Sequence, residues 1–231
     1  MTMPAPIEVL VVDKERQRDV HRGTTYLAEL ELVRKDGFEG EIQLEMTAKQ
    51  DRQRMGTRGG ILTVPPDQNR AWYPCFLPEW LPMDLTRRII VHGVVAVPDP
   101  KGNVRYLTKP GNARITMIME GALLKLSTEN SDVVTPIGEI QEIAVNVARS
   151  PKLPLPVKVE LVVPEEAKAF ISATPMLIEP NKTSGVLQIF SKIDEQLRGQ
   201  WNLTVRATAL QDGEWPVISE TEIRIEYVSV P

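Results

Sequence analysis

Much of the 231-residue chain can be laid over itself, and this internal repeat limits the choice of fold more than any other feature of the sequence. Moving the chain by 115 residues places "AELELVR", 28–34, on "IAVNVAR", 143–149. The same offset places "IQLEM", 42–46, on "VKVEL", 157–161. A repeat of this length predicts two similar domains in tandem.

The repeat continues beyond these strands, with a register that drifts toward the C-terminus. The offset of 115 also places Leu62, Pro65 and Trp72 on Leu177, Pro180 and Leu187. After that the register shifts by one residue, so that Ile89, Val91 and Val95 match Leu203, Val205 and Ala209. The last strands, "ARITMIM" at 113–119 and "TEIRIEY" at 221–227, match at an offset of 108. The connection before them is therefore expected to be longer in the first copy.

Apolar and polar residues alternate through most of the chain. This period is typical of β-strands, in which successive side chains point to opposite faces, and it is clear over 26–33, 41–46 and 114–119. Only "PEEAKAF", 164–170, and "KIDEQLRG", 192–199, have helical composition, and both are too short for more than one turn of helix. The predicted class is therefore all-β.

A repeat of roughly 110 residues with about seven short strands is typical of an immunoglobulin-like sandwich. We therefore predict two tandem immunoglobulin-like antiparallel β-sandwiches, over residues 1–120 and 121–231. The boundary is expected at 119–123, because "MEGALLKL" ends one alternating strand and begins the next without a spacer rich in Pro, Ser or Gly.

The connection that follows the strand at 28–34 differs from its counterpart in the second copy. In the first copy Gly37 and Gly40 allow backbone angles that a Cβ resists, so a tight turn is predicted at Asp36-Gly37. In the second copy the three prolines of "SPKLPLP", 150–156, cannot donate to a strand ladder. This segment is expected at a sheet edge, where it would block the addition of another strand. A polyproline II segment bound by a partner is the alternative.

The run "VRKDGFEGEIQLEM", followed by "ILTVPP" and later by "IIVHGVVAV", resembles the Ig-like repeats of large secreted and surface proteins from planctomycete-type bacteria. Those repeats read Arg-x-x-Gly-Phe-x-Gly, and the matching residues are Arg34, Gly37, Phe38 and Gly40. In the second copy only Arg149 matches. The resemblance implies an Ig-like fold and an extracytoplasmic location, secreted or at the cell surface. The paired cysteines that bridge the sheets of antibody domains are absent from the sequence.

Charge and cysteine content limit the expected partners and compartment. The net charge of −4 gives no general attraction to nucleic acid, and the basic run at 49–58 contains an aspartate but no aromatic residue, so we expect a solvated loop there. Cys75 is the only cysteine, which excludes a disulfide within the chain. We recognise neither a signal peptide in the first twenty residues nor an apolar run long enough for membrane insertion. The chain is therefore either cytoplasmic or a piece of an exported protein whose signal lies elsewhere.

Residues with catalytic or metal-binding chemistry are scarce. His21 and His92 lack zinc-site spacing, no G-x-S-x-G elbow occurs, and we expect no catalytic residue, metal or cofactor. "MGTRGG", 55–60, has no Walker lysine and is expected to be a mobile loop. Asp99 and Asn103 could offer oxygens to Ca²⁺, but further carboxylates are missing nearby, so a plain hairpin turn is favoured.

The segment "WYPCFLPEWLP", 72–82, concentrates aromatic residues where the second copy has "LQIFSKIDEQL". Large rigid rings are typical of contact surfaces, so Trp72, Tyr73, Phe76 and Trp80 are the candidate contact residues for polysaccharide or protein. The alternative is a structural role, in which a strand from Trp72 to Leu77 buries alternate rings and a proline-rich crossing between the sheets follows it.

The first functional hypothesis is therefore a non-enzymatic spacer or adhesion module of an extracytoplasmic bacterial protein or surface assembly, with a protein partner or neighbouring domains of a longer chain. The second is an accessory module that binds polysaccharide or protein through the aromatic segment. A third is a non-catalytic pair of domains attached to a hydrolase outside the given residues. Fold alone does not choose among them.

Overall fold

The computed structural model describes residues 3–47, 56–83 and 86–229, which form two compact units, Met1–Gly121 and Ala122–Pro231. Each unit has its own buried apolar cluster, the first drawn from Ile7 to Met119 and the second from Leu123 to Tyr227. We describe the units separately.

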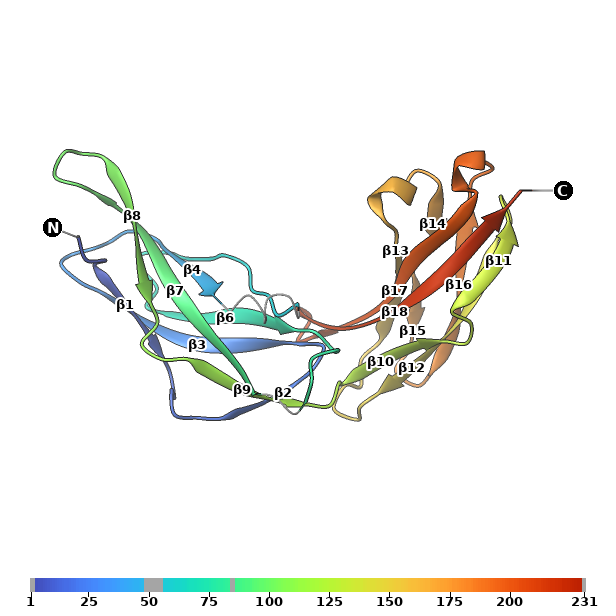
Figure 1. Ribbon diagram of the computed structural model, residues 1–231. Coiled ribbons are helices and arrows are strands. Elements are labelled where there is room, and N and C mark those ends of the chain that lie inside the picture. The colour runs from blue at the N-terminus through green and yellow to red at the C-terminus, as the bar shows by residue number, and fades with distance from the viewer. Residues whose placement is uncertain (1–2, 48–55, 84–85, 230–231) are drawn as a thin grey trace. The chain divides into compact units, whose positions relative to one another are not determined.

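The first unit consists of two sheets (Figure 1). Its strands are β1 (Ile7–Val11), β2 (Arg18–His21), β3 (Thr24–Arg34), β4 (Ile42–Thr47), β5 (Leu62–Val64), β6 (Arg70–Leu77), β7 (Thr86–Pro98), β8 (Val104–Pro110) and β9 (Ile115–Glu120). One sheet has the order β1-β3-β6, and the other has the order β2-β9-β7-β4-β5, with β8 paired to β7.

The second unit repeats this plan. Its strands are β10 (Leu124–Thr128), β11 (Asp132–Pro136), β12 (Gln141–Arg149), β13 (Val157–Val162), β14 (Ile171–Ala173), β15 (Met176–Ile178), β16 (Ser184–Ser191), β17 (Gly199–Gln211) and β18 (Trp215–Val228). The sheet orders are β10-β12-β16-β14 and β11-β18-β17-β13-β15. The two segments of helical composition each form one short 3-10 helix, η1 (Glu165–Ala167) and η2 (Glu195–Leu197), as predicted.

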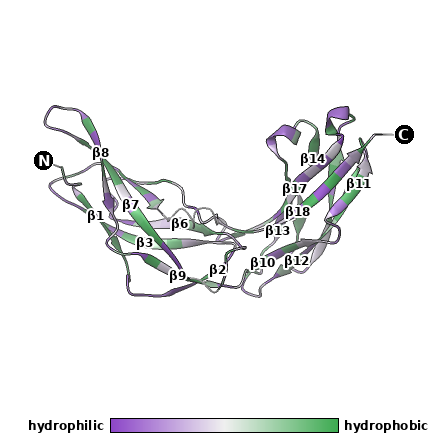
Figure 2. Ribbon diagram, in the orientation of Figure 1, coloured by the Kyte–Doolittle hydropathy of each residue, from purple (hydrophilic) through white to green (hydrophobic). Residues whose placement is uncertain are grey.

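The predicted fold class is confirmed: both units are immunoglobulin-like sandwiches. In each, the first strand pairs antiparallel in one sheet, and the chain then crosses to pair parallel with the last strand of the other sheet, β2 with β9 and β11 with β18. These are the parallel pairs among the described strands, and all other ladders are antiparallel. Figure 2 shows hydrophobic and hydrophilic residues succeeding one another along β18, and buried and exposed residues alternate from Glu222 to Val228.

The register of the repeat shifts earlier than the sequence predicts. Ala28 and Ile143 are equivalent at the offset of 115, and their ladder partners are Tyr73 and Leu187. Tyr73, rather than Trp72, is therefore the counterpart of Leu187, and the offset in β6 is 114. A slip of one residue exchanges the two faces of a strand, which is why the difference matters for the candidate contact residues.

The same correction applies to β5, where the expected match of Leu62 with Leu177 is wrong. Leu62 pairs with Leu44, and the equivalent residue Val159 pairs with Met176. One extra residue therefore lies between β4 and β5 of the first unit. Further along, the offsets of 114 for β7 with β17 and of 108 for β9 with β18 agree with the ladders.

The two connections between sheets differ from each other in conformation but share an anchor. Asp36 and Gly37 have φ values of 52° and 71°, which confirms the predicted tight turn. The expectation that 150–156 is a sheet edge is wrong, because this segment is a loop that carries the chain from β12 in one sheet to β13 in the other. Leu153 is fully buried there and occupies the position of Phe38, which packs against the first core. The prolines shape a crossing loop around this anchor.

Each sandwich is tied together by one arginine, and the two arginines occupy equivalent positions in the two units. Arg34, at the end of β3, donates from Nη2 to the carbonyl oxygen of Pro65 at 2.8 Å and contacts two more oxygens of the loop between β5 and β6. Arg149, at the end of β12, donates to the carbonyl oxygens of Ile178 at 2.8 Å and Lys182 at 2.5 Å. Because a guanidinium is a planar fork of donors, one side chain can hold a whole loop to the neighbouring strand. We call these two residues the arginine clamps.

The last strand is interrupted in the first unit and continuous in the second. From the pair Ile89–Ile115 to the pair His92–Pro110, β7 advances by three residues and its partner by five, so the partner contains a two-residue bulge. The β17–β18 ladder runs without interruption from Gly199 to Gln211. The bulge, a turn of five residues in place of three, and one further ladder pair together produce the longer connection that the sequence predicts.

The first and last strands are joined by one side chain in each unit. In the first, the Oδ1 atom of Asn112, within the bulge, accepts a hydrogen bond from the backbone N–H of Val11 at 2.8 Å. In the second, the Oγ atom of Ser219 on β18 accepts one from the backbone N–H of Leu126 at 2.8 Å. Different residues thus satisfy a backbone donor of the first strand, at the end of β1 in the first unit and in the middle of β10 in the second.

Candidate interaction surfaces

The aromatic segment on β6 divides between the two faces of its sheet. Trp72 is 52% exposed and lies on the outer face, whereas Tyr73 is fully buried in the core. Tyr73 therefore cannot belong to a contact surface with Trp72, and that part of the sequence-based assignment is wrong. Burial raises the pKa of Tyr73 to about 12 and that of Cys75 to about 12, as expected for groups enclosed in an apolar core.

The other two candidate contact residues lie at the far end of β6. Phe76 is half-buried, and the guanidinium of Arg58 covers its ring at 4.7 Å from the centroid. Trp80 is 57% exposed and follows the strand. Trp72 lies about 17 Å from Leu77, the last residue of β6, at about 3.3 Å per residue. Because Trp80 lies beyond that end of the strand, Trp72 and Trp80 are two separate exposed rings.

The glycine-rich segment is held against β6. The backbones of Arg58 and Phe76 exchange hydrogen bonds of 3.1 and 2.7 Å, and the hydroxyl of Tyr73 donates to the carbonyl oxygen of Gly60 at 2.7 Å. A Cβ on Gly59 would lie 2.5 Å from that hydroxyl, so close packing requires glycine there. The expected mobile loop is therefore wrong for 56–60, while most of the basic run, residues 49–55, lies outside the described residues.

A polar groove of about 400 Å³ opens beside Trp72, where β1 leaves the edge of β3. The segment between β1 and β2 forms one wall, and residues of β3 and β6 form the other. The lining side chains important for its chemistry are Asp13, Arg16, Gln17, Asp19, Glu29 and Trp72. The sequence did not reveal this groove, because Trp72 lies more than forty residues along the chain from the other lining residues; the charged run "DKERQRD" was the available signal.

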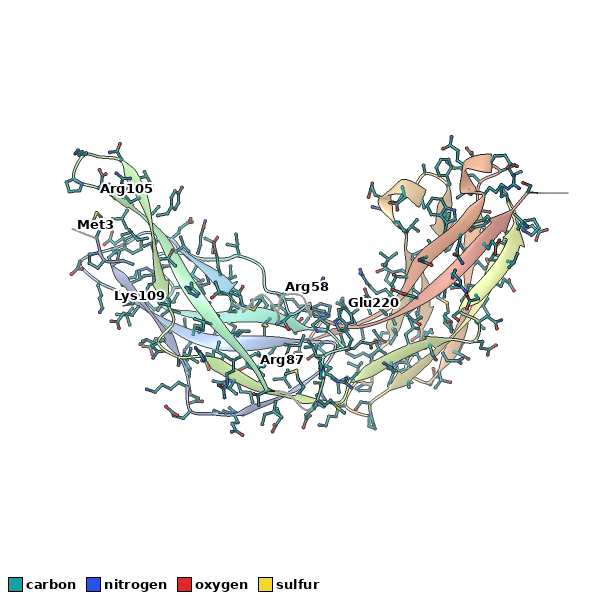
Figure 3. The ribbon with its side chains drawn as sticks, viewed as in Figure 1. Met3, Arg58, Arg87, Arg105, Lys109 and Glu220 are labelled. Atoms are coloured by element: carbon teal, nitrogen blue, oxygen red, sulfur yellow. The ribbon has the colours of Figure 1, made fainter. Side chains whose placement is uncertain are left out.

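The hairpin formed by β7 and β8 exposes a second set of apolar side chains. Tyr106 and Val104 are 74% and 60% exposed on one face of β8, and a groove of about 830 Å³ separates the hairpin from Met3 and Pro4. Arg105 lies near the hairpin tip, with Lys109 further along β8 and Met3 beside them (Figure 3). In the second unit the position of Tyr106 is occupied by Pro216.

The turn at the tip of this hairpin is held by its own side chains. The carboxylate of Asp99 accepts hydrogen bonds from the backbone N–H groups of Lys101 and Asn103, both at 2.9 Å, and from Nε of Arg105 at 3.0 Å. Desolvation, the largest single influence, acts to raise the pKa of Asp99, but bonds from Asn103, Arg105 and Lys101 together lower it below the usual range. The plain hairpin turn favoured by the sequence is confirmed.

The two histidines are separately engaged. The ring of His21 contacts the carbonyl oxygen of Gly121 at 2.8 Å and the carboxylate of Glu120 at 3.1 Å, and His92 contacts the hydroxyl of Thr47. Among the described residues, no three His, Cys, Asp or Glu side chains gather closely enough to hold a metal ion. The same residues include no helix long and apolar enough to cross a membrane.

Comparison with known proteins finds similarity only among solved structures. No protein-family model and no curated protein matches the sequence. The chain is similar to protocadherin Gamma B7 extracellular cadherin domains 1–4, with 11% identity over 97% of this chain and 51% of that chain and a TM-score of 0.31. It is also similar to a marsupial T cell receptor, with 11% identity over 97% and 74% of the two chains and a TM-score of 0.32.

A third similar structure is the teleost fish polymeric Ig receptor ectodomain, with 10% identity over 97% of this chain and 100% of that chain and a TM-score of 0.27. This chain spans about half the length of the protocadherin fragment. Similarity at this level carries no argument about function, so the proposals below rest on the surfaces of the chain itself.

Proposed function

We propose that this chain is a non-enzymatic interaction module of an extracytoplasmic bacterial protein or surface assembly, and that its first sandwich makes the contact. The partner is another protein or a neighbouring domain of a longer chain. The Arg34-to-Gly40 motif and its resemblance to planctomycete-type surface repeats support the bacterial, extracytoplasmic setting.

The observation that carries this proposal is the exposed apolar face of the β7–β8 hairpin. Val104 and Tyr106 present apolar surface on β8, next to a turn already ordered by Asp99, so little conformational entropy is lost on binding. Lys101 lies in the turn of the same hairpin, whereas Arg105 is paired with Asp99 and faces away from the apolar side chains. An exposed apolar face with a cation at its tip fits a protein surface whose apolar patch carries an acidic group at its rim.

Retention of a partner by the immobilised full chain tests this function. From an extract of surface proteins, we expect the wild type to retain a partner that the Tyr106→Ser variant retains at least tenfold less, with weaker retention at high salt. Ile193→Ser is the matched control, because Ile193 is 86% exposed in the second unit. Equal retention by all three proteins, or retention above background by none, would contradict the proposal.

The second candidate function is a ligand-binding accessory module, attached to a hydrolase in a longer chain. The exposed ring of Trp72 beside a polar groove favours it. This function and the first are compatible, because the groove and the hairpin share no lining residue.

A further inference from the structure

We propose that the groove beside Trp72 binds a neutral saccharide, with the indole ring against the apolar face of a sugar and the charged wall residues on its hydroxyls. This inference names the ligand class of the second candidate function and rests on it. The volume of about 400 Å³ lies in the range of small-molecule sites, roughly 300–1,000 Å³.

One wall of the groove is built by Arg18. The last ladder pair of β1 joins Val11 to Leu30, and the chain then leaves the sheet. Arg18 is buried, and its guanidinium donates to the carbonyl oxygens of Arg16 at 2.7 Å, Val12 at 2.9 Å and Asp13 at 3.0 Å. These bonds hold the wall in one conformation before any ligand arrives, which reduces the entropic cost of binding.

The opposite wall comes from the outer faces of β3 and β6. Trp72 lies directly across the ladder from Glu29, so their side chains share that face. Arg70 contacts the Oε1 atom of Glu29 at 3.2 Å and orients the carboxylate. A flat, exposed ring thus stands next to a positioned hydrogen-bond acceptor.

The balance of polar groups favours a neutral polyol over other ligands. Asp13, Asp19 and Glu29 supply acceptors, while Arg16 and Gln17 supply donors; sugar hydroxyls both donate and accept, and so can use both sets. The three carboxylates disfavour a polyanion, and Arg18 already directs its donors to backbone carbonyls. An apolar ligand would leave these charged groups desolvated without partners.

The second unit lacks every element of this groove. Only three residues separate β10, which ends at Thr128, from β11, which begins at Asp132. The positions of Glu29 and Trp72 are taken by Ala144 and Val186, which face each other across the β12–β16 ladder. The second unit therefore serves as an internal control for the groove, because it has a similar framework without the tryptophan ring and the charged wall.

The test is calorimetric titration of the full chain with cello-, xylo-, malto- and chito-oligosaccharides, with lysine and choline as cationic probes. We expect one of the saccharide classes to bind, and Trp72→Ala to weaken that binding at least tenfold. Asp19→Asn is expected to weaken it several-fold. Trp80→Ala is the matched control, because Trp80 is a similarly exposed tryptophan of the same segment that does not line the groove; we expect it to change the affinity less than twofold.

Three results would contradict the saccharide assignment. Binding by none of the saccharides, equal weakening by Trp72→Ala and Trp80→Ala, or tighter binding of lysine or choline than of any saccharide would overturn this proposal. Partner retention through Tyr106 is measured separately, so its persistence alongside a failed titration would show that the groove assignment has failed while the proposed interaction function holds. Hydrogen exchange of each variant verifies that the fold is intact.

Discussion

Arg34 and Arg149 make the same kind of clamp in the two sandwiches, whereas Trp72 has only Val186 as its counterpart. The framework is thus shared: equivalent strands, equivalent clamps, and one side chain in each unit that ties the first strand to the last. The differences lie in the crossing between the first two strands, on the outer face of β6, and in the bulged last strand. These are surface positions of the first unit, which is why we place recognition there.

The largest expected effect tests the register on which this comparison depends. Tyr73 and Leu187 are both fully buried, so Tyr73→Ala and Leu187→Ala should each lower the free energy of unfolding of their own unit by about 2–5 kcal/mol. Trp72→Ala and Val186→Ala remove half-exposed groups and should each change it by about 0.5 kcal/mol or less.

Hydrogen exchange with mass spectrometry measures the four variants, because it reports the opening of each unit separately. A loss for Trp72→Ala as large as for Leu187→Ala would show that the offset of 115 persists through β6 and that the equivalence drawn here is wrong.

The sequence predicts the class of fold, the duplication and the offsets of most long strands, because alternation shows which residues share a face and the recurring residues set the offset. It does not predict the slip before β5. Met176, Leu177 and Ile178 are all apolar, so alternation cannot identify which of them faces the core. The same ambiguity affects adjacent Trp72 and Tyr73.

The clamps and the groove could not be predicted for a different reason. Arg34 and Arg149 stand out as a repeated residue, but their acceptors are backbone carbonyls some thirty positions away, which any sequence provides. The groove depends on where β1 leaves the sheet, and this place is set by ladder pairing between distant segments.

The clamps provide the next test of the shared framework. Arg34→Ala and Arg149→Ala should each lower the unfolding free energy of their own unit by about 1–3 kcal/mol, because several carbonyl oxygens lose a charged donor. Lysine at either position should restore only part of the loss, since an ammonium lacks the planar fork.

Thermal and denaturant unfolding would measure these changes, with Arg224→Ala as control. Arg224 forms an exposed ion pair with Asp132, and its loss should cost about 0–1 kcal/mol. A clamp variant no less stable than this control would contradict a structural role for the clamps.

A comparable or smaller effect is expected for the bonds between the first and last strands. Ser219→Ala leaves the N–H of Leu126 without its buried acceptor and should cost about 1–3 kcal/mol. Asn112→Ala removes a partly buried bond and should cost about 0.5–1.5 kcal/mol. Protection of Leu126 and Val11 from hydrogen exchange would fall accordingly, and unchanged protection would show that these side chains do not close the sandwiches.

The smallest expected difference is in alkaline stability. Burial raises the pKa of Cys75 from 9.0, and that of Tyr73 from 10.0, to about 12 in each case. Both groups therefore ionise at a lower pH in the unfolded chain than in the folded one. The stability of the first unit should be fully present below about pH 9 and decline as the pH rises toward 12, with about 1 kcal/mol lost by about pH 9.5. In the second unit Ile189 takes the place of Cys75, and the buried Tyr227 has a raised pKa. Its decline should therefore begin about one pH unit higher.

Denaturant midpoints between pH 8 and 11 would measure this difference, with Cys75→Val as the matched variant. Cys75→Val should remove most of the decline in the first unit between pH 9 and 10. An unchanged slope in that variant, or an equal decline of both units over this range, would refute the assignment of the effect to Cys75.

The most direct test of the central claim, that recognition belongs to the first copy of a duplicated framework, is backbone and indole NMR of the full chain during titration with the tightest-binding oligosaccharide. We predict shifts confined to residues 12–29 and to the strand around Trp72, with none at the equivalent Ala144 and Val186. Shifts of similar size in the second unit, or none at Trp72, would contradict the account.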